Sequence, residues 1–104
     1  MSDNEESKCP VERAAAIIGS RWTALILRDL FEKKTCRYQE LLESLAGIAP
    51  NTLSDRLKML EDKGIIERKF YELHPPRADY CLTQKGRELG PILLAMRNWG
   101  NRHR

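Results

Sequence analysis

A short turn between two short amphipathic segments constrains this chain more than any other sequence feature. Helical spacing of apolar residues predicts one helix over residues 38–45. Pro50 can open a second helix that runs to Lys63, because a proline costs nothing in a first turn. The apolar positions are Tyr38, Leu41, Leu42 and Leu45 before the turn, and Leu53, Leu57 and Leu60 after it. Residues 46–49, which include Gly47, join the two segments, and this arrangement is a helix-turn-helix pattern.

A β-hairpin is predicted directly after this pattern. Residues 65–73 are rich in β-forming side chains, and residues 78–82 form the returning strand. Residues 74–77, His-Pro-Pro-Arg, are predicted to be the turn between them. A brief edge strand at residues 35–37 completes the β-structure. The whole hairpin, residues 65–82, therefore forms a wing beside the helix pair.

Further helices are expected at both ends of the chain. Pro10 opens a first helix, and residues 21–32 form a second one with an apolar stripe. At the other end, Thr83 caps a helical stretch that covers residues 84–103. Proline inside a helix costs about 3 kcal/mol, so we expect a break or kink at Gly90-Pro91.

The order of these segments predicts the fold class. It runs helix, helix, short strand, helix, helix, hairpin, helix, which is a mainly α winged helix-turn-helix with a small β-hairpin wing. A chain of 104 residues suits one domain, and 41% hydrophobic residues are enough for it to fold. We assign residues 1–8 to a flexible acidic tail and residues 9–104 to the domain.

Composition disfavours several classes of protein. The three cysteines include no CxxC pair and there are two histidines, so neither a disulfide framework, a metal site nor a Ser-His-Asp triad is expected. We predict no cofactor, no metal and no catalytic residue, and hence no enzyme. No apolar run approaches the roughly 18 residues of a membrane span, and the acidic N-terminus is no secretory signal. A cytoplasmic protein without a membrane partner is the expectation.

The charge is mildly basic. The chain carries a formal net charge of +3. Residues 1–8 hold one lysine against three acids, so the remainder carries +5. This excess suits an anionic partner such as nucleic acid, although an ordinary soluble surface can carry it too.

The chain resembles the HxlR family of bacterial and archaeal transcription regulators over about residues 9–99. The residues that carry the resemblance are Cys9-Pro10, Ile18-Gly19-Ser20-Arg21-Trp22, Ile26-Leu27, Leu30, Arg37-Tyr38-Gln39-Glu40-Leu41, residues 48–61, Gly64-Ile65-Ile66, Pro76, Tyr80, Leu82-Thr83, Gly86, Leu89, Pro91 and Trp99. The resemblance implies a homodimer that binds double-stranded DNA at a palindromic operator, on the nucleoid of a bacterial or archaeal cell. It implies no particular small-molecule effector.

The helix over residues 50–63 is the predicted recognition helix. Its leucines face the core, and successive residues are turned by about 100°, so Asn51, Asp55, Lys58 and Asp62 point roughly away from the core, with Thr52, Ser54 and Arg56 on the flanks. The candidate DNA contacts on this helix are Asn51, Thr52, Ser54, Asp55, Arg56 and Lys58. Its cations and acids balance, however, and a solvated face held by charge pairs is the simpler interpretation of this helix alone.

Basic residues outside this helix supply further candidate contacts. On the wing, Arg68, Lys69 and Arg77 can reach a minor groove or its phosphates. Arg37, with Lys33 and Lys34, forms a second cluster that can hold backbone phosphate. A rigid hairpin and a solvated helix end with ordinary surface charge are the alternatives for these two clusters.

The two ends of the chain are the predicted dimer interface. Both are helical and apolar, and they hold more apolar surface than one small core needs. The interface residues are Ala14, Ile17, Ile18, Ile92, Met96 and Trp99. Two-fold symmetry then sets two recognition helices against two half-sites. The alternative is that these faces merely close a monomer.

Cys9 is a candidate redox sensor, because a helix start favours a thiolate and some HxlR members use a cysteine in this place. The alternative is a Cys9 without a sensing role, since the acids Glu5 and Glu6 work against a thiolate. Cys36 and Cys81 are expected in or near the core. The competing hypothesis for the whole chain is a winged-helix protein–protein adaptor without sequence-specific DNA binding. A thiol catalyst using Cys9 lacks a resolving partner.

Overall fold

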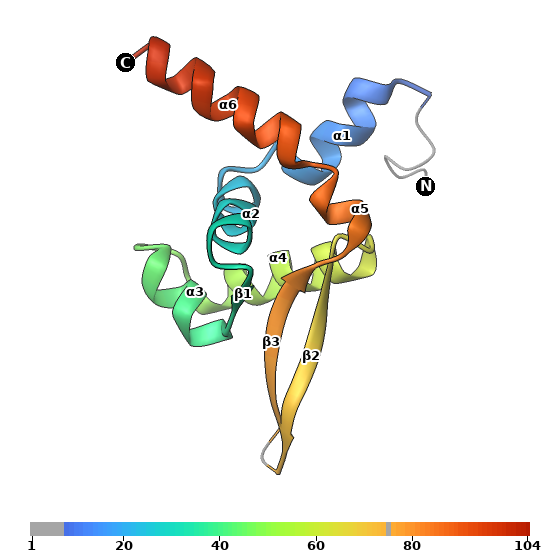
Figure 1. The fold of residues 1–104 in the computed structure, drawn as a ribbon, viewed down its shortest axis with the longest axis vertical. Helices are drawn as coiled ribbons and strands as arrows, with labels where there is room; N and C mark the ends of the chain where they lie inside the picture. Colours follow the sequence, from blue (N-terminus) through green and yellow to red (C-terminus); the bar gives the residue numbers. More distant parts are fainter. Residues whose placement is uncertain (1–7, 75) are drawn as a thin grey trace.

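The computed structural model describes residues 8–74 and 76–104, so most of the predicted tail and Pro75 lie outside the described residues. The elements in chain order are α1 (Pro10–Ile18), α2 (Arg21–Lys33), β1 (Thr35–Cys36), α3 (Tyr38–Ser44), α4 (Pro50–Asp62), β2 (Ile66–Leu73), β3 (Pro76–Leu82), α5 (Gln84–Arg87) and α6 (Gly90–Arg102). This order confirms the predicted winged helix-turn-helix. Figure 1 shows the β2–β3 hairpin projecting from the helical body.

The three strands form one antiparallel sheet in the order β1-β3-β2. The predicted turn over residues 74–77 is wrong in its second half, because β3 begins at Pro76 and pairs it with Leu73. Proline is tolerated there because β1 pairs with β3 only at Tyr80 and Cys81, so the far end of β3 has a free edge.

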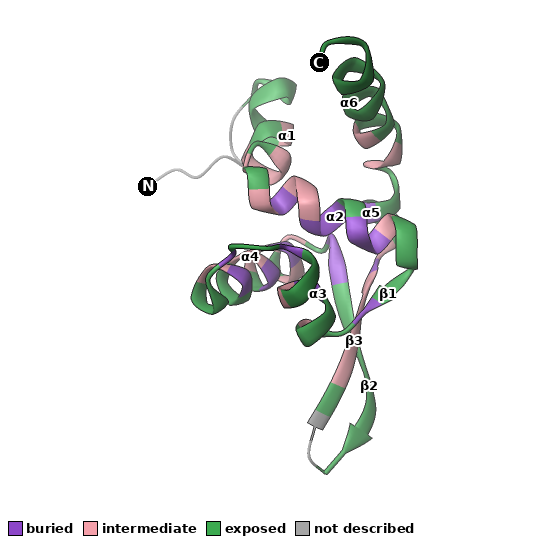
Figure 2. Cartoon of the chain, turned by 90° about the vertical axis from the view of Figure 1, so that its left-hand side faces the viewer, coloured by how far each residue is buried: buried purple, intermediate pink, exposed green. Residues whose placement is uncertain are grey.

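The core lies where α2, α4 and the sheet meet, as Figure 2 shows. From α4, the stripe Leu53, Leu57 and Leu60 is buried, as its spacing predicts. The residues packed with it include Ile26, Leu27 and Leu30 of α2, Leu41 and Leu45 from α3 and its end, Ile65 directly before β2, and Ile66 and Leu82 from the sheet. This packing fixes the rotation of α4 about its own axis.

The turn between α3 and α4 owes its shape to one glycine and one isoleucine. Gly47 has φ +93°, a conformation that side chains with a Cβ rarely adopt. The next residue, Ile48, is buried, and its N–H donates to the Leu45 carbonyl at 3.0 Å. The chain therefore reverses direction tightly, and Ile48 anchors this turn to the core.

A second tight junction joins the start of β2 to α5. The Thr83 N–H donates to the Ile65 carbonyl at 3.0 Å. The Thr83 hydroxyl accepts the Gly86 N–H at 3.1 Å, which confirms Thr83 as a helix cap. Gly86 packs so closely that a Cβ built on it would lie 2.1 Å from the Ile65 carbonyl oxygen.

The predicted break in the C-terminal helix is confirmed. α5 ends at Arg87, and α6 begins at Gly90 with Pro91 in its first turn. Neither α1 nor α6 contains a buried residue. Both extend from the end of the molecule opposite the hairpin tip (Figure 1).

We expect Gly86→Ala to destabilise the fold by about 1–3 kcal/mol, because the added methyl group would overlap the Ile65 carbonyl. Gly100→Ala is the matched control. A Cβ at Gly100, in α6, meets nothing within 4 Å, so this change should leave stability unchanged or raise it by up to about 1 kcal/mol. Urea unfolding followed by circular dichroism measures both. Equal midpoints for Gly86→Ala and the parent would contradict the close packing.

Candidate nucleic-acid interface

The outward face of α4 is polar and open. Asn51, Asp55 and Lys58 are exposed, as predicted, and Ser54 on the flank of the helix is exposed as well. The Lys58 ammonium lies 3.7 Å from the Asp62 carboxylate, one turn further along the helix. This face carries short hydrogen-bonding side chains near the helix start, which suits contact with base edges or phosphates.

Two other residues predicted on α4 are half-buried on its flank. Thr52 and Arg56 share this flank with Met59, which packs against the core. The Arg56 Nε is buried and has no hydrogen-bond partner among the described residues. Arg56 is three residues from Leu53 and four from Leu60, so its stem necessarily lies beside the buried stripe. It projects less freely than the sequence suggested.

Tyr38 is a residue of this region that the sequence assigned only to the core stripe. Its ring packs against the core, and its hydroxyl donates to the Pro50 carbonyl at 3.2 Å. The Ser54 hydroxyl donates to the Tyr38 hydroxyl oxygen at 3.5 Å. Tyr38 thus braces the first turn of α4 from the start of α3. Helical spacing gives no signal for a contact between two helices.

The wing is tied to α4 by an ion pair. The Arg68 guanidinium donates to the Glu61 carboxylate at 2.8 Å, and this hydrogen bond raises the pKa of Arg68. The same guanidinium lies 5.5 Å from the centre of the Phe70 ring. Arg68 is therefore held at the base of the wing, against the last turn of α4.

Two more candidate contacts also meet carboxylates. Arg37 lies 3.6 Å from Asp79 and 4.8 Å from the centre of the Tyr71 ring, so it links the start of α3 to the wing. Arg77 lies 2.9 Å from Glu72 across the hairpin.

Lys69 differs from the other wing cations. It makes no ion pair within the described part of the chain, and Asp79, its partner in the strand register, pairs with Arg37.

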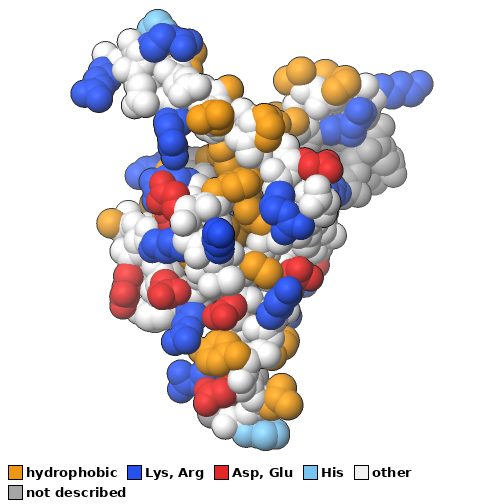
Figure 3. Space-filling view, viewed as in Figure 1, with side chains coloured by type: hydrophobic (Ala, Val, Ile, Leu, Met, Phe, Trp, Pro, Cys, Tyr) orange, Lys and Arg blue, Asp and Glu red, His pale blue; other side chains and the backbone are white. Residues whose placement is uncertain are grey.

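Acidic and basic side chains, coloured red and blue, are mixed over the lower half of the molecule in Figure 3. Exposed ion pairs contribute only about 0–1 kcal/mol, so phosphate oxygens can replace these carboxylates at little cost.

The residues predicted to form the dimer interface lie at the end of the molecule opposite the hairpin tip. Ala14, Ile17 and Ile18 of α1 are half-buried, whereas Trp99 of α6 is 60% exposed. Ile92 and Met96 are exposed as well. Leu94 and Val11 are 53% and 75% exposed, and they were not predicted because neither falls on the apolar stripe of its helix. Hydrophobic side chains gather between α1 and α6 in Figure 3.

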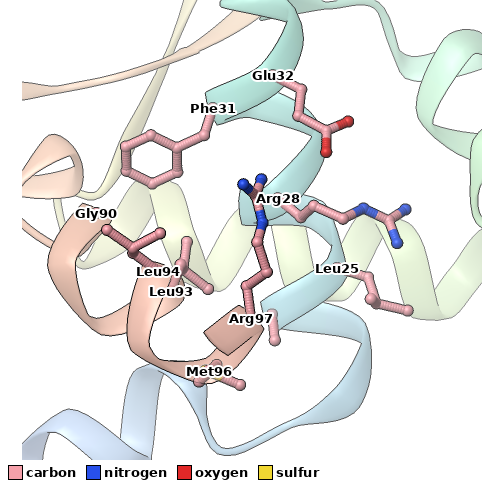
Figure 4. Close-up of a pocket in the computed structure, with 10 residues that line it drawn as sticks. Leu25, Arg28, Phe31, Glu32, Gly90, Leu93, Leu94, Met96 and Arg97 are labelled. Atoms are coloured by element: carbon pink, nitrogen blue, oxygen red, sulfur yellow. The ribbon is translucent and has the colours of Figure 1, made fainter. Parts of the chain in front are cut away.

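A groove of about 430 Å³ separates α6 from α2. Its walls are mainly apolar and include Leu25, Phe31 and Leu93. Figure 4 shows the Arg97 side chain extending from α6 toward α2 across this groove, between Phe31 and Arg28. The apolar surface of α6 therefore continues into a cleft.

The three cysteines have different environments. Cys9 is exposed, directly before α1. Cys36 is buried, and desolvation raises the pKa of its thiol to about 11. Burial and the nearby Glu67 raise the pKa of Cys81. Cys36 pairs with Tyr80 in the register and Cys81 with Thr35, so the two thiols point to opposite faces of the sheet.

The described residues contain neither a candidate membrane span nor a candidate metal site. None of the helices in residues 8–74 and 76–104 is long and apolar enough to span a bilayer. No group of three or more His, Cys, Asp or Glu side chains there is arranged to hold a metal ion.

Comparison with known proteins identifies similar chains. A family model described as HxlR-like helix-turn-helix matches residues 17–104. An uncharacterized HTH-type transcriptional regulator of Synechocystis sp. is 41% identical over 93 residues, which cover 89% of this chain and 68% of that protein. The regulator YdeP of Bacillus subtilis is 35% identical over 103 residues, covering 99% of this chain and 80% of YdeP.

Solved structures agree with this result. The oxidized form of the redox regulator HypR matches with a TM-score of 0.85 and 34% identity, covering 92% of this chain and 98% of that one. The reduced form of the transcriptional regulator YodB of B. subtilis matches with a TM-score of 0.76 and 32% identity, covering 93% and 95%. These relatives are regulators and not enzymes, as predicted for this chain.

We expect the thiols to react with iodoacetamide in a fixed order in mildly alkaline buffer. Cys9 should be modified first because it is exposed, and Cys81 more slowly. Cys36 should react only after unfolding, because the thiolate is the nucleophile and a pKa of about 11 leaves little of it. Peptide mass spectrometry over time follows the order, and concentrated guanidinium chloride provides the control. Equal rates for Cys36 and Cys9 in the folded protein would refute this assignment.

Proposed function

The chain belongs to the HxlR-like helix-turn-helix family, and we propose that it acts as a homodimer on a palindromic operator. As a member of this family it is a DNA-binding transcriptional regulator. The observation that best supports the proposal is the outward face of α4, which is polar and exposed while its opposite stripe is locked in the core.

In this proposal α4 is the recognition helix and lies in a major groove. Asn51, Ser54 and Asp55 approach base edges, and Lys58 reaches a phosphate or a base. Thr52 and Arg56 contact the backbone at the side of the groove, because their flank is half-buried. Arg37, Arg68 and Arg77 exchange their carboxylate partners for phosphates. Lys69, which has no carboxylate partner among the described residues, binds a phosphate without losing an ion pair.

The proposed dimer interface is formed by α1 and α6. Ile92, Met96 and Trp99 lie exposed on α6, and Leu94 joins them. Ala14, Ile17 and Ile18 contribute from α1. Exposed apolar side chains gathered at one end of a molecule mark an interface, and a second copy offers the same surface by two-fold symmetry. The two recognition helices would then lie about 34–36 Å apart, one turn of DNA.

Cys9 is the proposed redox-responsive residue. It is exposed and directly precedes α1, so its oxidation would act on the proposed dimer interface. The neighbour HypR is described as a redox regulator. The thiolate would reduce a peroxide to water or an alcohol and become a sulfenic acid, which then condenses with a second thiol and releases water. We place this regulator in the cytoplasm of a bacterial or archaeal cell.

The decisive experiment selects the preferred sites of the purified chain from fragmented genomic DNA. A palindromic consensus with half-sites one helical turn apart is expected, with an affinity that falls steeply as salt rises. Fragments enriched without a common sequence would contradict the operator. Absence of salt-dependent binding would favour the protein–protein adaptor.

On the selected site, Lys58→Gln should weaken binding and lower the slope of log affinity against log salt by about one unit, if Lys58 contacts phosphate. Asp62→Asn should act in the opposite direction, because it removes the carboxylate that lies 3.7 Å from Lys58. Fluorescence anisotropy over a salt series measures both. Arg102→Gln near the end of α6 removes one charge far from α4 and is the control. Equal effects of Lys58→Gln and Arg102→Gln would show that this face of α4 makes no specific contact.

Trp99→Ala should weaken the dimer at least tenfold and leave the fold intact, because the ring is 60% exposed in the single chain and its burial would come from the partner. Sedimentation equilibrium gives the dimer dissociation constant, and thermal unfolding monitors the fold. The exposed Asn98→Ala, one position away on α6, is the control. A parent protein that sediments as a monomer at micromolar concentration would exclude the interface.

A further inference from the structure

A hollow on the sheet carries charge that the DNA-binding proposal leaves largely unused. It lies between the end of α2, strands β1, β2 and β3, and α5, and has a volume of about 800 Å³. Cavities of this size hold small organic molecules. The strand register places Thr35, Cys81 and Glu67 side by side across three strands, so they form one row of its floor.

The charges around the hollow are unbalanced. Lys34, Lys69 and Arg87 line it together with a single acid, Glu67, which gives a formal charge of +2. None of these three cations pairs with a carboxylate among residues 8–74 and 76–104. Other cations of the chain do pair with a carboxylate within 4.0 Å; these are Arg28, Arg37, Lys58, Arg68 and Arg77. The hollow therefore concentrates positive charge that the fold does not neutralise.

Arg87 is held in position by neutral groups. One terminal nitrogen of its guanidinium donates to the Leu82 carbonyl at 3.1 Å, and the other donates to the Gln84 side-chain oxygen at 2.9 Å. These bonds orient the guanidinium without cancelling its charge. An anion arriving in the hollow meets a donor that is already placed, which reduces the entropy lost on binding.

Lys34 reaches the hollow from a strained backbone. Its φ of +70° is the one positive φ outside glycine in the described part of the chain. The residue directly follows α2 as its C-terminal cap, and its N–H donates to the Leu30 carbonyl at 3.0 Å. Glycine would adopt this conformation without strain. Lys34 keeps this strain and places a long cationic side chain at the rim of a cavity. Strain retained at such a position points to a function for the side chain.

We propose that this hollow binds a small phosphate monoester or a chemically similar organic dianion. Lys34, Lys69 and Arg87 hold the phosphate group, and the organic part lies against the Phe31 side chain on the hollow's wall. The proposal goes beyond DNA recognition and does not depend on it, because binding can be measured without DNA.

Binding there would act on the wing and on α6. Lys69 belongs to β2, so a ligand that engages it removes one cation from the proposed DNA contacts. Phe31 lines both this hollow and the groove between α2 and α6. A Cβ at Gly90, the first residue of α6, would lie 3.3 Å from the Phe31 ring, so this ring rests against the base of α6. A ligand against Phe31 thus touches the support of that helix.

Phenyl phosphate is a suitable probe, because above its second phosphate pKa of about 6 it is a dianion with an aromatic ring. We expect it to cause saturable shifts in ¹⁵N NMR spectra of the full chain at the Lys34, Thr35, Cys81 and Arg87 amides. Phenol at matched ionic strength supplies the ring without the phosphate and should cause none. Shifts that do not saturate, or shifts equal for the two compounds, would overturn the proposal.

Four variants test the charge assignment. Lys34→Gln and Lys69→Gln should each weaken binding of phenyl phosphate about threefold to tenfold. Lys33→Gln is the matched control, since it removes the same charge from the adjacent exposed residue outside the hollow, and it should change affinity less than about twofold. Glu67→Gln should strengthen binding, a gain that damage to the fold cannot produce.

Equal losses of affinity for phenyl phosphate in Lys33→Gln and Lys34→Gln would show that binding depends only on the net charge of the protein. This result would refute the site. The same variants measured on operator DNA identify the source of the phosphate. Loss of DNA affinity in Lys34→Gln and Lys69→Gln, with no saturable binding of phenyl phosphate, would assign these cations to the DNA backbone and also refute the proposal. Failure to find an operator leaves the measurement with phenyl phosphate unaffected.

Discussion

The packing of α4 against α2 is the interaction on which the rest of the structure depends. Leu53, Leu57 and Leu60 are at most 2% exposed, and the α2 residues that share the core with them are equally buried. Replacing one such leucine by alanine costs about 2–5 kcal/mol, a large part of the stability of a small domain. The stripe thus permits one rotation of α4, which decides that Asn51 and Asp55 face solvent and that Arg56 does not project freely.

Weak interactions then orient the parts around this packed centre. Arg68 joins the wing to Glu61 on α4, Arg37 joins the start of α3 to Asp79 on β3, and Tyr38 braces Pro50. Each ion pair is exposed enough that water competes with it, so none fixes the fold as the leucines do. That combination suits a protein that binds a polyanion, because the orientation is set beforehand and the cations can still change partners.

Local sequence signals account for the parts that were predicted correctly. Pro50, Gly47 and Pro91 act on the backbone in their immediate neighbourhood, and the predicted helix starts at 50 and 84 agree with the structure. The error at 74–77 arose because the Pro-Pro pair indicates a turn in local sequence, whereas the edge of β3 is free at that end and accepts Pro76 as its first residue.

The remaining features depend on contacts between elements that are distant in sequence. Two such contacts depend on how the folded elements pack together. They are the pairing of Arg68 with Glu61 and the hydrogen bond from Tyr38 to Pro50. Periodicity assigns a residue to a face and does not say what lies opposite. For the same reason, the hollow at Lys34, Lys69 and Arg87 had no signal in the sequence, since its lining comes from five separate elements.

Phe31 lies where two surface cavities of this molecule meet. It lies between the cationic hollow and the apolar groove under α6, and it supports Gly90 at the start of that helix. In the proposed dimer, the direction of α6 sets the distance between the two recognition helices, and that distance must match one turn of DNA. A small shift of one aromatic ring at the base of a 13-residue helix is enlarged along its length. Occupancy of the hollow could therefore alter operator affinity without any change in α4, whose own position the leucine stripe keeps fixed.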